Sequence, residues 1–246
     1  MFKSVSEIDR IRPNTFLIVG DTGTGKTHLS LTFPKPIFFI DLEDGISRVL
    51  PNLPDTKDIN IARCISDNLG EAYDMFSDAL SEAVDGGGKT LVIDSMTVLD
   101  SLVQYHVVRT KKNIPPEFVQ LDIGSRNKYH FKWFQIMNKM LKSEFENLVF
   151  IARKVRWEKL EGGKLIQAED VRPKSWSELP YYADYEIHCY SVPLFSENNP
   201  HDIVAFEYRA QLIDKRKRRE GKILKTPVIT SPTFEKLMEV LRNEEK

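Results

Sequence analysis

The residues with the clearest chemical potential lie near the start of the sequence, in the segment from Gly20 to Thr27. Its glycines allow the backbone to turn tightly, and Lys26 and Thr27 follow the last of them. Backbone N–H groups turned toward one point, together with a lysine ammonium group, form a cradle for phosphates. The order Gly-x-x-x-x-Gly-Lys-Thr matches the phosphate-binding P-loop pattern in full. We therefore expect ATP to bind here.

Individual roles follow from the pattern. Lys26 should reach the β- and γ-phosphates, and the Thr27 hydroxyl should bind Mg²⁺. The competing interpretation is an ordinary glycine-rich turn before a helix, and the strand that precedes the loop disfavours it. The residues that we expect to contact the nucleotide are Gly20, Asp21, Thr22, Gly23, Thr24, Gly25, Lys26, Thr27 and His28.

A carboxylate for the same metal stands at the end of a later apolar run, Leu91-Val92-Ile93-Asp94. A buried strand of this kind delivers one carboxylate to its C-terminal end, as a Walker B strand does. We expect Asp94 to hold Mg²⁺ through water. The alternative is that Asp94 only begins a turn, as aspartate often does after a strand.

Hydrolysis of ATP also requires a group that orients the attacking water. Glu43 is the candidate, because it stands just past the second predicted strand. The alternative is that Asp41, Glu43 and Asp44 form a solvated acidic turn without a catalytic role.

Short apolar runs alternate with amphipathic segments over the first 150 residues, which predicts an α/β fold with a mainly parallel, twisted sheet flanked by helices. The later runs, Asp184–Val192 and Ile203–Ile213, are expected to be antiparallel strands at the sheet edge. A hairpin that turns at Gly162-Gly163 precedes them. We expect one domain over 1–246, with an ATP-binding core at 13–153, the hairpin and edge strands at 154–225, and a C-terminal helix at 232–243.

The composition limits the partners, bound metals and cellular location that we expect. Lys and Arg number 35 against 36 Asp and Glu, so any binding of nucleic acid requires a local basic patch. The two cysteines, Cys64 and Cys189, have no metal-ligand or disulfide spacing. Without a signal-peptide pattern or a membrane-spanning apolar run, we expect a cytoplasmic protein that is not secreted and has no membrane partner.

Two segments could supply a basic patch that binds nucleic acid. The first, Arg153–Trp176, mixes cations with aromatic residues, a combination that binds single-stranded nucleic acid, although Trp157 and Trp176 could instead cover the core. The second is the basic run Lys215–Arg219. It could follow a phosphate backbone or be a solvated turn between strands.

The P-loop, the Glu43 segment and the Asp94 strand together resemble the RecA/KaiC-like ATPases, in which the catalytic glutamate follows the second strand. The layout over nearly the full chain is similar to phage RecA-like ATPases of the Sak single-strand annealing group, often described as AAA-type ATP-binding proteins. The later part of this layout comprises the hairpin, Ala183-Asp184 before a strand, the basic run, and the short terminal helix.

The resemblance implies a homo-oligomer in which Lys215, Arg216 or Lys217 reaches the ATP of a neighbouring subunit and acts in catalysis. The sequence also departs from this family. In that family a glutamine, asparagine or histidine that senses the γ-phosphate usually follows the strand read as Leu148–Ala152, whereas Arg153-Lys154 stands here. Either cation could contact a γ-phosphate, but the usual switch residue is missing.

We therefore expect a Mg²⁺-dependent ATPase acting on single-stranded DNA in recombination or annealing. A nucleotide-binding switch or assembly module, with little hydrolysis and no DNA contact, is the alternative.

Overall fold

The computed structural model describes residues 12–108, 121–161, 164–196, 203–214 and 228–243, with the backbone alone for 156–171 and 213–214. Its strands are β1 (Asn14–Gly20), β2 (Ile37–Asp41), β3 (Ile59–Arg63), β4 (Thr90–Asp94), β5 (Asn147–Glu161), β6 (Lys164–Pro173), β7 (Tyr185–Phe195), β8 (Ile203–Asp214) and β9 (Ile229–Thr230). Its helices are α1 (Lys26–Ser30), α2 (Leu69–Gly86), α3 (Met96–Val108), α4 (Ile123–Leu141), α5 (Leu179–Tyr182) and α6 (Phe234–Asn243), with 3-10 turns at Ile46–Arg48 and Leu50–Asn52.

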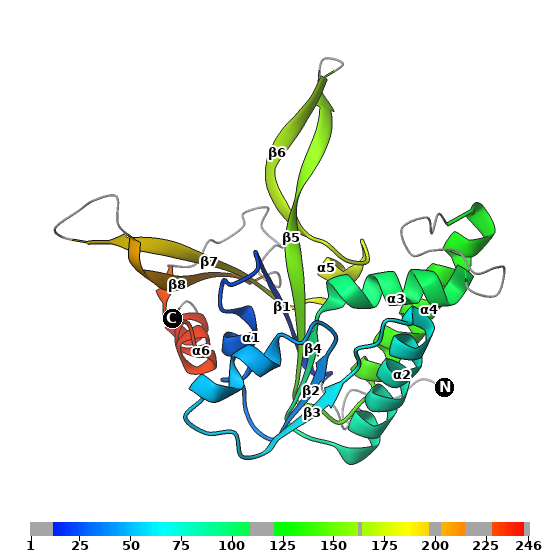
Figure 1. The fold of residues 1–246 in the computed structure, drawn as a ribbon, viewed down its shortest axis with the longest axis horizontal. Helices are drawn as coiled ribbons and strands as arrows, with labels where there is room; N and C mark the ends of the chain where they lie inside the picture. The colour runs from blue at the N-terminus through cyan, green and yellow to red at the C-terminus, as the bar shows by residue number, and fades with distance from the viewer. Residues whose placement is uncertain (1–11, 109–120, 162–163, 197–202, 215–227, 244–246) are drawn as a thin grey trace, which may run out of the picture.

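The strands form one sheet in the order β3-β2-β4-β5-β1-β7-β8-β9, and β6 pairs with β5 outside this path (Figure 1). Every pairing from β3 to β7 along that order is parallel. β8 and β9 add antiparallel strands at one edge. A mostly parallel sheet with antiparallel strands near the C-terminus is the fold class that the sequence predicted, and it is confirmed.

Helices cover both faces of the sheet, which explains why the sequence of β1 is apolar throughout. Leu17 and Val19 pack in a core cluster with residues of α2, α3 and α4. Phe16 and Ile18, which alternate with them, pack in a second cluster with residues of α1 and α6. Because successive side chains of a strand point to opposite faces, a strand covered on both sides needs an uninterrupted apolar run.

Two predictions about the later strands were wrong. β7 was expected to be an antiparallel edge strand, but it lies beside β1 and parallel to it, with Ile18 opposite Ile187. The strand expected at Leu148–Ala152 does not stop there, because β5 continues as one strand to Glu161 and forms the first arm of the projecting hairpin with β6 (Figure 1). The continuous apolar run of β5 ends at Ala152, but its backbone hydrogen bonding continues beyond that residue, with β6 as the partner strand.

Trp176 belongs to the core, which settles one of the alternatives for the Arg153–Trp176 segment. The Trp176 side chain is 4% exposed, and its ring stacks on Trp133 of α4 with centroids 5.4 Å apart. Such a buried ring cannot stack on a nucleic-acid base.

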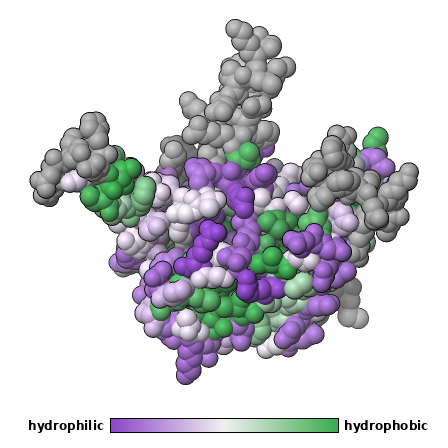
Figure 2. All heavy atoms as spheres, in the orientation of Figure 1, coloured by the Kyte–Doolittle hydropathy of each residue, from purple (hydrophilic) through white to green (hydrophobic). Residues whose placement is uncertain are grey.

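β7 and β8 extend beyond the body as a long arm (Figure 1). Apolar side chains gather on the outer part of this arm, where Figure 2 shows a green patch. The exposed residues there are Leu194, Phe195, Ile203, Val204 and Phe206. Among the described helices, none combines the length and the apolar character needed to cross a bilayer.

The start of β1 is fixed by a buried carboxylate. Asp184, just before β7, accepts hydrogen bonds from the Thr15 backbone N–H at 3.0 Å and from the Thr15 hydroxyl at 2.8 Å. Arg12 pairs with the same carboxylate. Asp184 and Thr15 are both buried, so the contact joins β1 to β7 where water cannot replace it.

Replacing Asp184 by Ala should therefore destabilise the fold. The buried Thr15 N–H would lose its acceptor, whereas the Thr15 hydroxyl keeps the Tyr182 carbonyl oxygen at 2.6 Å. The loss costs about 2 kcal/mol and lowers the melting temperature by about 4–8 °C. Thermal unfolding followed by circular dichroism measures the change. Asp78→Ala, on the exposed surface of α2, is the matched control and should change the melting temperature little. Equal melting temperatures for the two variants would contradict this assignment.

Candidate functional site

The P-loop joins β1 to α1, at the end of the sheet where the parallel strands have their C-termini. A Cβ atom on Gly20 would lie 2.4 Å from the Cys189 carbonyl oxygen and 2.6 Å from Thr24 Oγ1, so only glycine fits there. Gly25 has φ of 81°, and a Cβ on it would lie 3.3 Å from the Tyr208 ring. The loop thus depends on glycine for both close approach and left-handed backbone.

The loop is closed by bonds to the Asp21 carbonyl oxygen. Lys26 Nζ donates to it at 2.6 Å, and Thr24 Oγ1 donates to it at 2.8 Å. Burial lowers the pKa of Lys26, although the nearby carboxylates of Asp94 and Glu43 oppose this shift. The ammonium group is therefore held inside the loop, partly stripped of water, where an anion gains more from it than in solvent.

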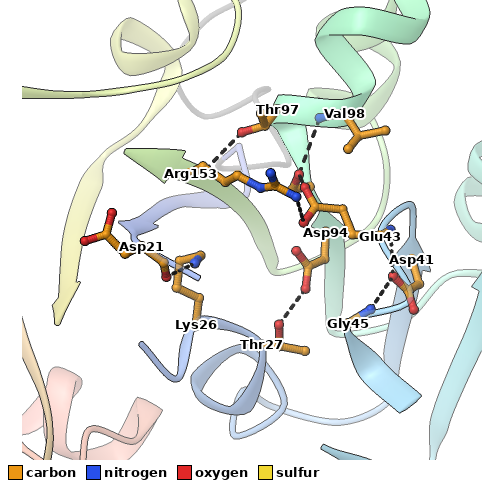
Figure 3. A network of polar contacts seen from close by, with 11 residues as sticks. Asp21, Lys26, Thr27, Asp41, Glu43, Gly45, Asp94, Thr97, Val98 and Arg153 are labelled. Atoms are coloured by element: carbon orange, nitrogen blue, oxygen red, sulfur yellow. Dashed lines mark hydrogen bonds and ion pairs between the residues drawn. The ribbon is translucent and has the colours of Figure 1, made fainter. Parts of the chain in front are cut away.

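Asp94 ends β4 beside the loop, and its Oδ2 accepts a hydrogen bond from Thr27 Oγ1 at 2.7 Å (Figure 3). The Asp94 residue is 4% exposed, and burial raises the pKa of its carboxyl group to about 6. A hydroxyl and a carboxylate oxygen side by side suit Mg²⁺, which takes few protein oxygens and keeps its remaining places for water and phosphate. Gly45 lies directly beside them, since a Cβ there would be in ordinary contact, 3.5 Å from Asp94 Oδ2 and 3.6 Å from Thr27 Oγ1.

The segment after β2 is organised by Asp41. Its buried carboxylate accepts the backbone N–H groups of Glu43 at 3.1 Å, Gly45 at 3.2 Å and Ile46 at 3.4 Å. The alternative of a solvated acidic turn therefore does not hold for Asp41, because its buried carboxylate holds the turn in place by these hydrogen bonds. Asp44 is exposed and pairs with Arg63 at 2.6 Å.

Glu43 lies half-buried between two donors (Figure 3). The Ser95 hydroxyl donates to its Oε1, and Arg153 Nη2 contacts its Oε2 at 2.8 Å. Ser95 follows Asp94 directly, so the carboxylates of the β2 loop and of β4 are brought to neighbouring positions. Their convergence follows from the sheet order, because β2 pairs with β4 and Asp41 lies opposite Asp94.

The remaining predicted residues are distributed as follows. Asp21, Thr22 and Gly23 are exposed in the loop, and His28 is exposed on α1. Lys215, Arg216 and Lys217 lie outside the described residues, as does the whole run 215–219.

Comparison of the sequence with models of known families identifies the family of this chain. A family model described as an AAA domain matches residues 12–193, a span that includes the P-loop, Glu43, Asp94 and Arg153. The chain belongs to the AAA domain family. No curated protein matches its sequence.

A solved structure supports the fold of this AAA domain. The structure is described as a prototypical ATPase from the type III secretion system of pathogenic bacteria, and it matches with a TM-score of 0.50 and 15% sequence identity. The match covers 76% of this chain and 53% of that chain, so the AAA domain spans about half of its length. The likeness shows a shared fold.

Sequence reasoning did not find the contact of Ser95, and it named Arg153 and Lys154 only as cations that could contact a γ-phosphate, without their partners in this AAA domain. Ser95 and Arg153 contact Glu43, and Lys154 contacts Asp21 with Nζ 2.5 Å from Oδ2. The signal for the two cations was present, since Arg153-Lys154 stands directly after the apolar part of β5. Their partners were not readable, because they come from segments more than 100 residues away.

The buried Asp94 carboxyl group predicts a pH-dependent stability. Its pKa of about 6 lies above the ordinary 3.8, so the folded protein binds the proton more tightly than the unfolded chain. Stability is then lost as pH rises from about 4 to about 6, by on the order of 3 kcal/mol when complete.

Asp94→Asn removes that loss and leaves an acceptor for the Thr27 hydroxyl. Without nucleotide or Mg²⁺, we expect the variant to melt several degrees above the wild type at pH 7.5, with the difference shrinking toward pH 5. Scanning calorimetry at both pH values gives the answer, and Asp78→Asn serves as the exposed control. A variant less stable than the wild type at pH 7.5 would refute the burial argument.

Proposed function

We propose that this chain binds ATP with Mg²⁺ and hydrolyses it. The observation that supports this most is how the residues come together: Lys26 and Thr27 at the start of α1 lie near Glu43, from the loop after β2, and Asp94, from β4 (Figure 3). Membership of the AAA domain family supports the same reading. Sites of this kind form where the C-terminal ends of parallel strands meet.

Each residue has a role suited to its surroundings. The P-loop N–H groups and Lys26 bind the phosphates, and Thr27 and Asp94 would hold Mg²⁺, which neutralises charge on the β- and γ-phosphates when bound. Asp94 can serve in this way because a nearby cation offsets the cost of ionising it inside the protein.

Glu43 is the group that would orient and deprotonate the attacking water. Its carboxylate is fixed by Ser95 and Arg153, while Asp41 fixes the backbone that carries it. A carboxylate held at one position beside the Asp94 strand supports this role, because a general base has to lie within hydrogen-bond reach of the water that it activates.

Two variants separate binding from turnover. Lys26→Ala should abolish nucleotide binding, because the loop loses its ammonium group. Glu43→Gln should retain binding and lose about 100-fold or more in kcat, because the amide cannot accept the proton. Phosphate release and fluorescent-nucleotide titration measure the two quantities, with circular dichroism to show that each variant folds. An unchanged ATPase rate in Lys26→Ala would rule the proposal out.

Action on single-stranded DNA, in recombination or annealing, is the finer proposal. It is supported by the hairpin of β5 and β6, which projects from the strand that carries Arg153 (Figure 1) and whose sequence contains Arg156, Trp157, Lys159 and Lys164. The basic run 215–219 adds support from sequence alone. Its Lys215, Arg216 and Lys217 would complete the site of a neighbouring subunit, and the exposed apolar patch on the β7–β8 arm is consistent with self-association.

Single-stranded DNA should then raise the ATPase rate several-fold, with binding that weakens steeply as salt increases. Rate measurements across a range of salt and oligonucleotide concentrations test this, with double-stranded DNA and RNA of the same length as comparisons. If the chain binds ATP but shows neither stimulation nor appreciable hydrolysis, a nucleotide-binding switch is the correct reading. One observation favours that second function: Arg153 engages the Glu43 carboxylate directly.

A further inference from the structure

Helices α2 and α4 have surfaces of opposite charge. α2 contains no Lys, Arg or His, and α4 contains no Asp or Glu. The exposed carboxylates of α2 are those of Glu71, Asp74, Asp78, Glu82 and Asp85. Because residues three or four positions apart lie on the same side of a helix, these side chains form one acidic stripe.

α4 has a matching basic stripe. It consists of Lys128, Lys132, Lys139 and Lys142, the last at the C-cap, with Gln135 between the two pairs. Successive positions are again three or four residues apart, so the lysines lie on one side of the helix. The acidic stripe at 71–85 and the basic stripe at 128–142 have the same length, about 21 Å at the rise of an α-helix.

The two stripes lie beside each other, because α2 and α4 are neighbours on one face of the sheet (Figure 1). Lys132 Nζ lies 5.4 Å from the centroid of the Tyr73 ring, and Lys139 Nζ donates to Ser81 Oγ at 2.5 Å. Both residue numbers increase from the first contact to the second, so the helices run parallel and the stripes cover the same levels. This helical layer thus separates the two signs of charge into adjacent rows.

The charge of these rows decides which partner the surface fits. On α2, Asp78 lies four residues from both Asp74 and Glu82, and like charges at that spacing destabilise a helix. A nucleic acid could follow the lysines of α4, but the carboxylates beside them would repel its phosphates. A second copy of this chain carries both signs in the same two rows, so it can place opposite charge against each stripe.

We propose that two copies of this chain pair through the α2–α4 surface, with the acidic stripe of each copy against the basic stripe of the other. A two-fold axis parallel to the helices exchanges their positions, so α2 of one copy covers α4 of the second. The axis keeps each residue at its level along the helices. It therefore brings Glu82 and Asp85 of one copy to Lys139 and Lys142 of the second.

These facing charges lie at the opposite end of the sheet from the nucleotide site. α2 ends at Gly86, shortly before β4 begins, and α4 ends at Leu141, shortly before β5 begins. The P-loop, in contrast, lies at the C-terminal ends of the parallel strands. The surface is also distinct from the apolar patch on the β7–β8 arm. The inference therefore goes beyond the proposed function and does not depend on it.

The interface is small, which sets the strength of the association. Two stripes about 21 Å long on helices about 10 Å wide cover on the order of 400 Å² of each copy, about half of a standard interface. Met75 beside the acidic stripe and Phe131 beside the basic stripe are exposed and add apolar contact. We expect a weak dimer with a Kd of about 10 μM or more, which dissociates as salt screens the charges.

Analytical ultracentrifugation of the full chain without nucleotide tests the proposal. The average mass should rise from monomer toward dimer with concentration at about 50 mM salt and stay monomeric at about 500 mM. Glu82→Lys with Asp85→Lys should abolish the rise, as should Lys139→Glu with Lys142→Glu. Glu235→Lys with Glu239→Lys, exposed on α6, is the matched control, because it changes the net charge as the α2 variant does and should leave the dimer intact.

Mixing the two reversed variants is the sharpest arm. Alone, the α2 variant places Lys against Lys at the facing positions, and the α4 variant places Glu against Glu. In an equimolar mixture every facing pair is again of opposite sign, so the dimer should return at low salt. Its return also shows that both variants fold.

Four results would overturn the inference. They are a wild type that stays monomeric up to about 300 μM at low salt, a mixture that does not associate, and an α6 control that dissociates as fully as the α2 variant. The fourth concerns single-stranded DNA. If Lys139→Glu with Lys142→Glu abolishes DNA binding and leaves the dimer intact, the basic stripe binds nucleic acid instead of a second copy.

Discussion

The carboxylates of Asp41, Glu43 and Asp94 converge at the C-terminal ends of the parallel strands. The site depends on holding this negative charge beside the phosphate-binding loop. Asp41 accepts hydrogen bonds from backbone N–H groups, and Glu43 is bound by the Ser95 hydroxyl and the Arg153 guanidinium group. Asp94 has the Thr27 hydroxyl, and its carboxyl pKa stays raised to about 6. The least compensated carboxylate is thus the one that we propose to face a metal cation.

The order of the strands makes this arrangement possible. β5 lies between β1 and β4, so the P-loop and Asp94 are separated by one strand, and the residues that follow its core part are cations. β2 lies on the far side of β4 and contributes Glu43. Glu43 and Asp94 therefore lie on the β2–β4 side, and the cations Arg153 and Lys154 lie between them and the P-loop.

The sequence was sufficient for the P-loop, for the strand ending in Asp94 and for the parallel core, because glycine spacing and apolar runs are local signals. It was insufficient for β7, whose neighbour β1 lies more than 160 residues earlier. The continuation of β5 into the hairpin was also missed, since the polar part of a strand lacks the burial that marks the apolar part. Asp184 could be read from the sequence as a motif residue, but its hydrogen bonds to Thr15 could not be predicted, because they join distant segments.

β5 has a mechanical consequence of its own. It runs unbroken from the packed core to the hairpin, with eight residues beyond Arg153, which span about 27 Å at the rise of an extended strand. Its pairing with β6 shifts register between Arg156 and Glu158, where a bulge bends a strand, and a tilt of about 10° at the root of an arm of this length displaces its far end by about 5 Å. The displacement equals the spacing between adjacent strands, so the position of the outer part of this hairpin depends closely on how the root of β5 is packed.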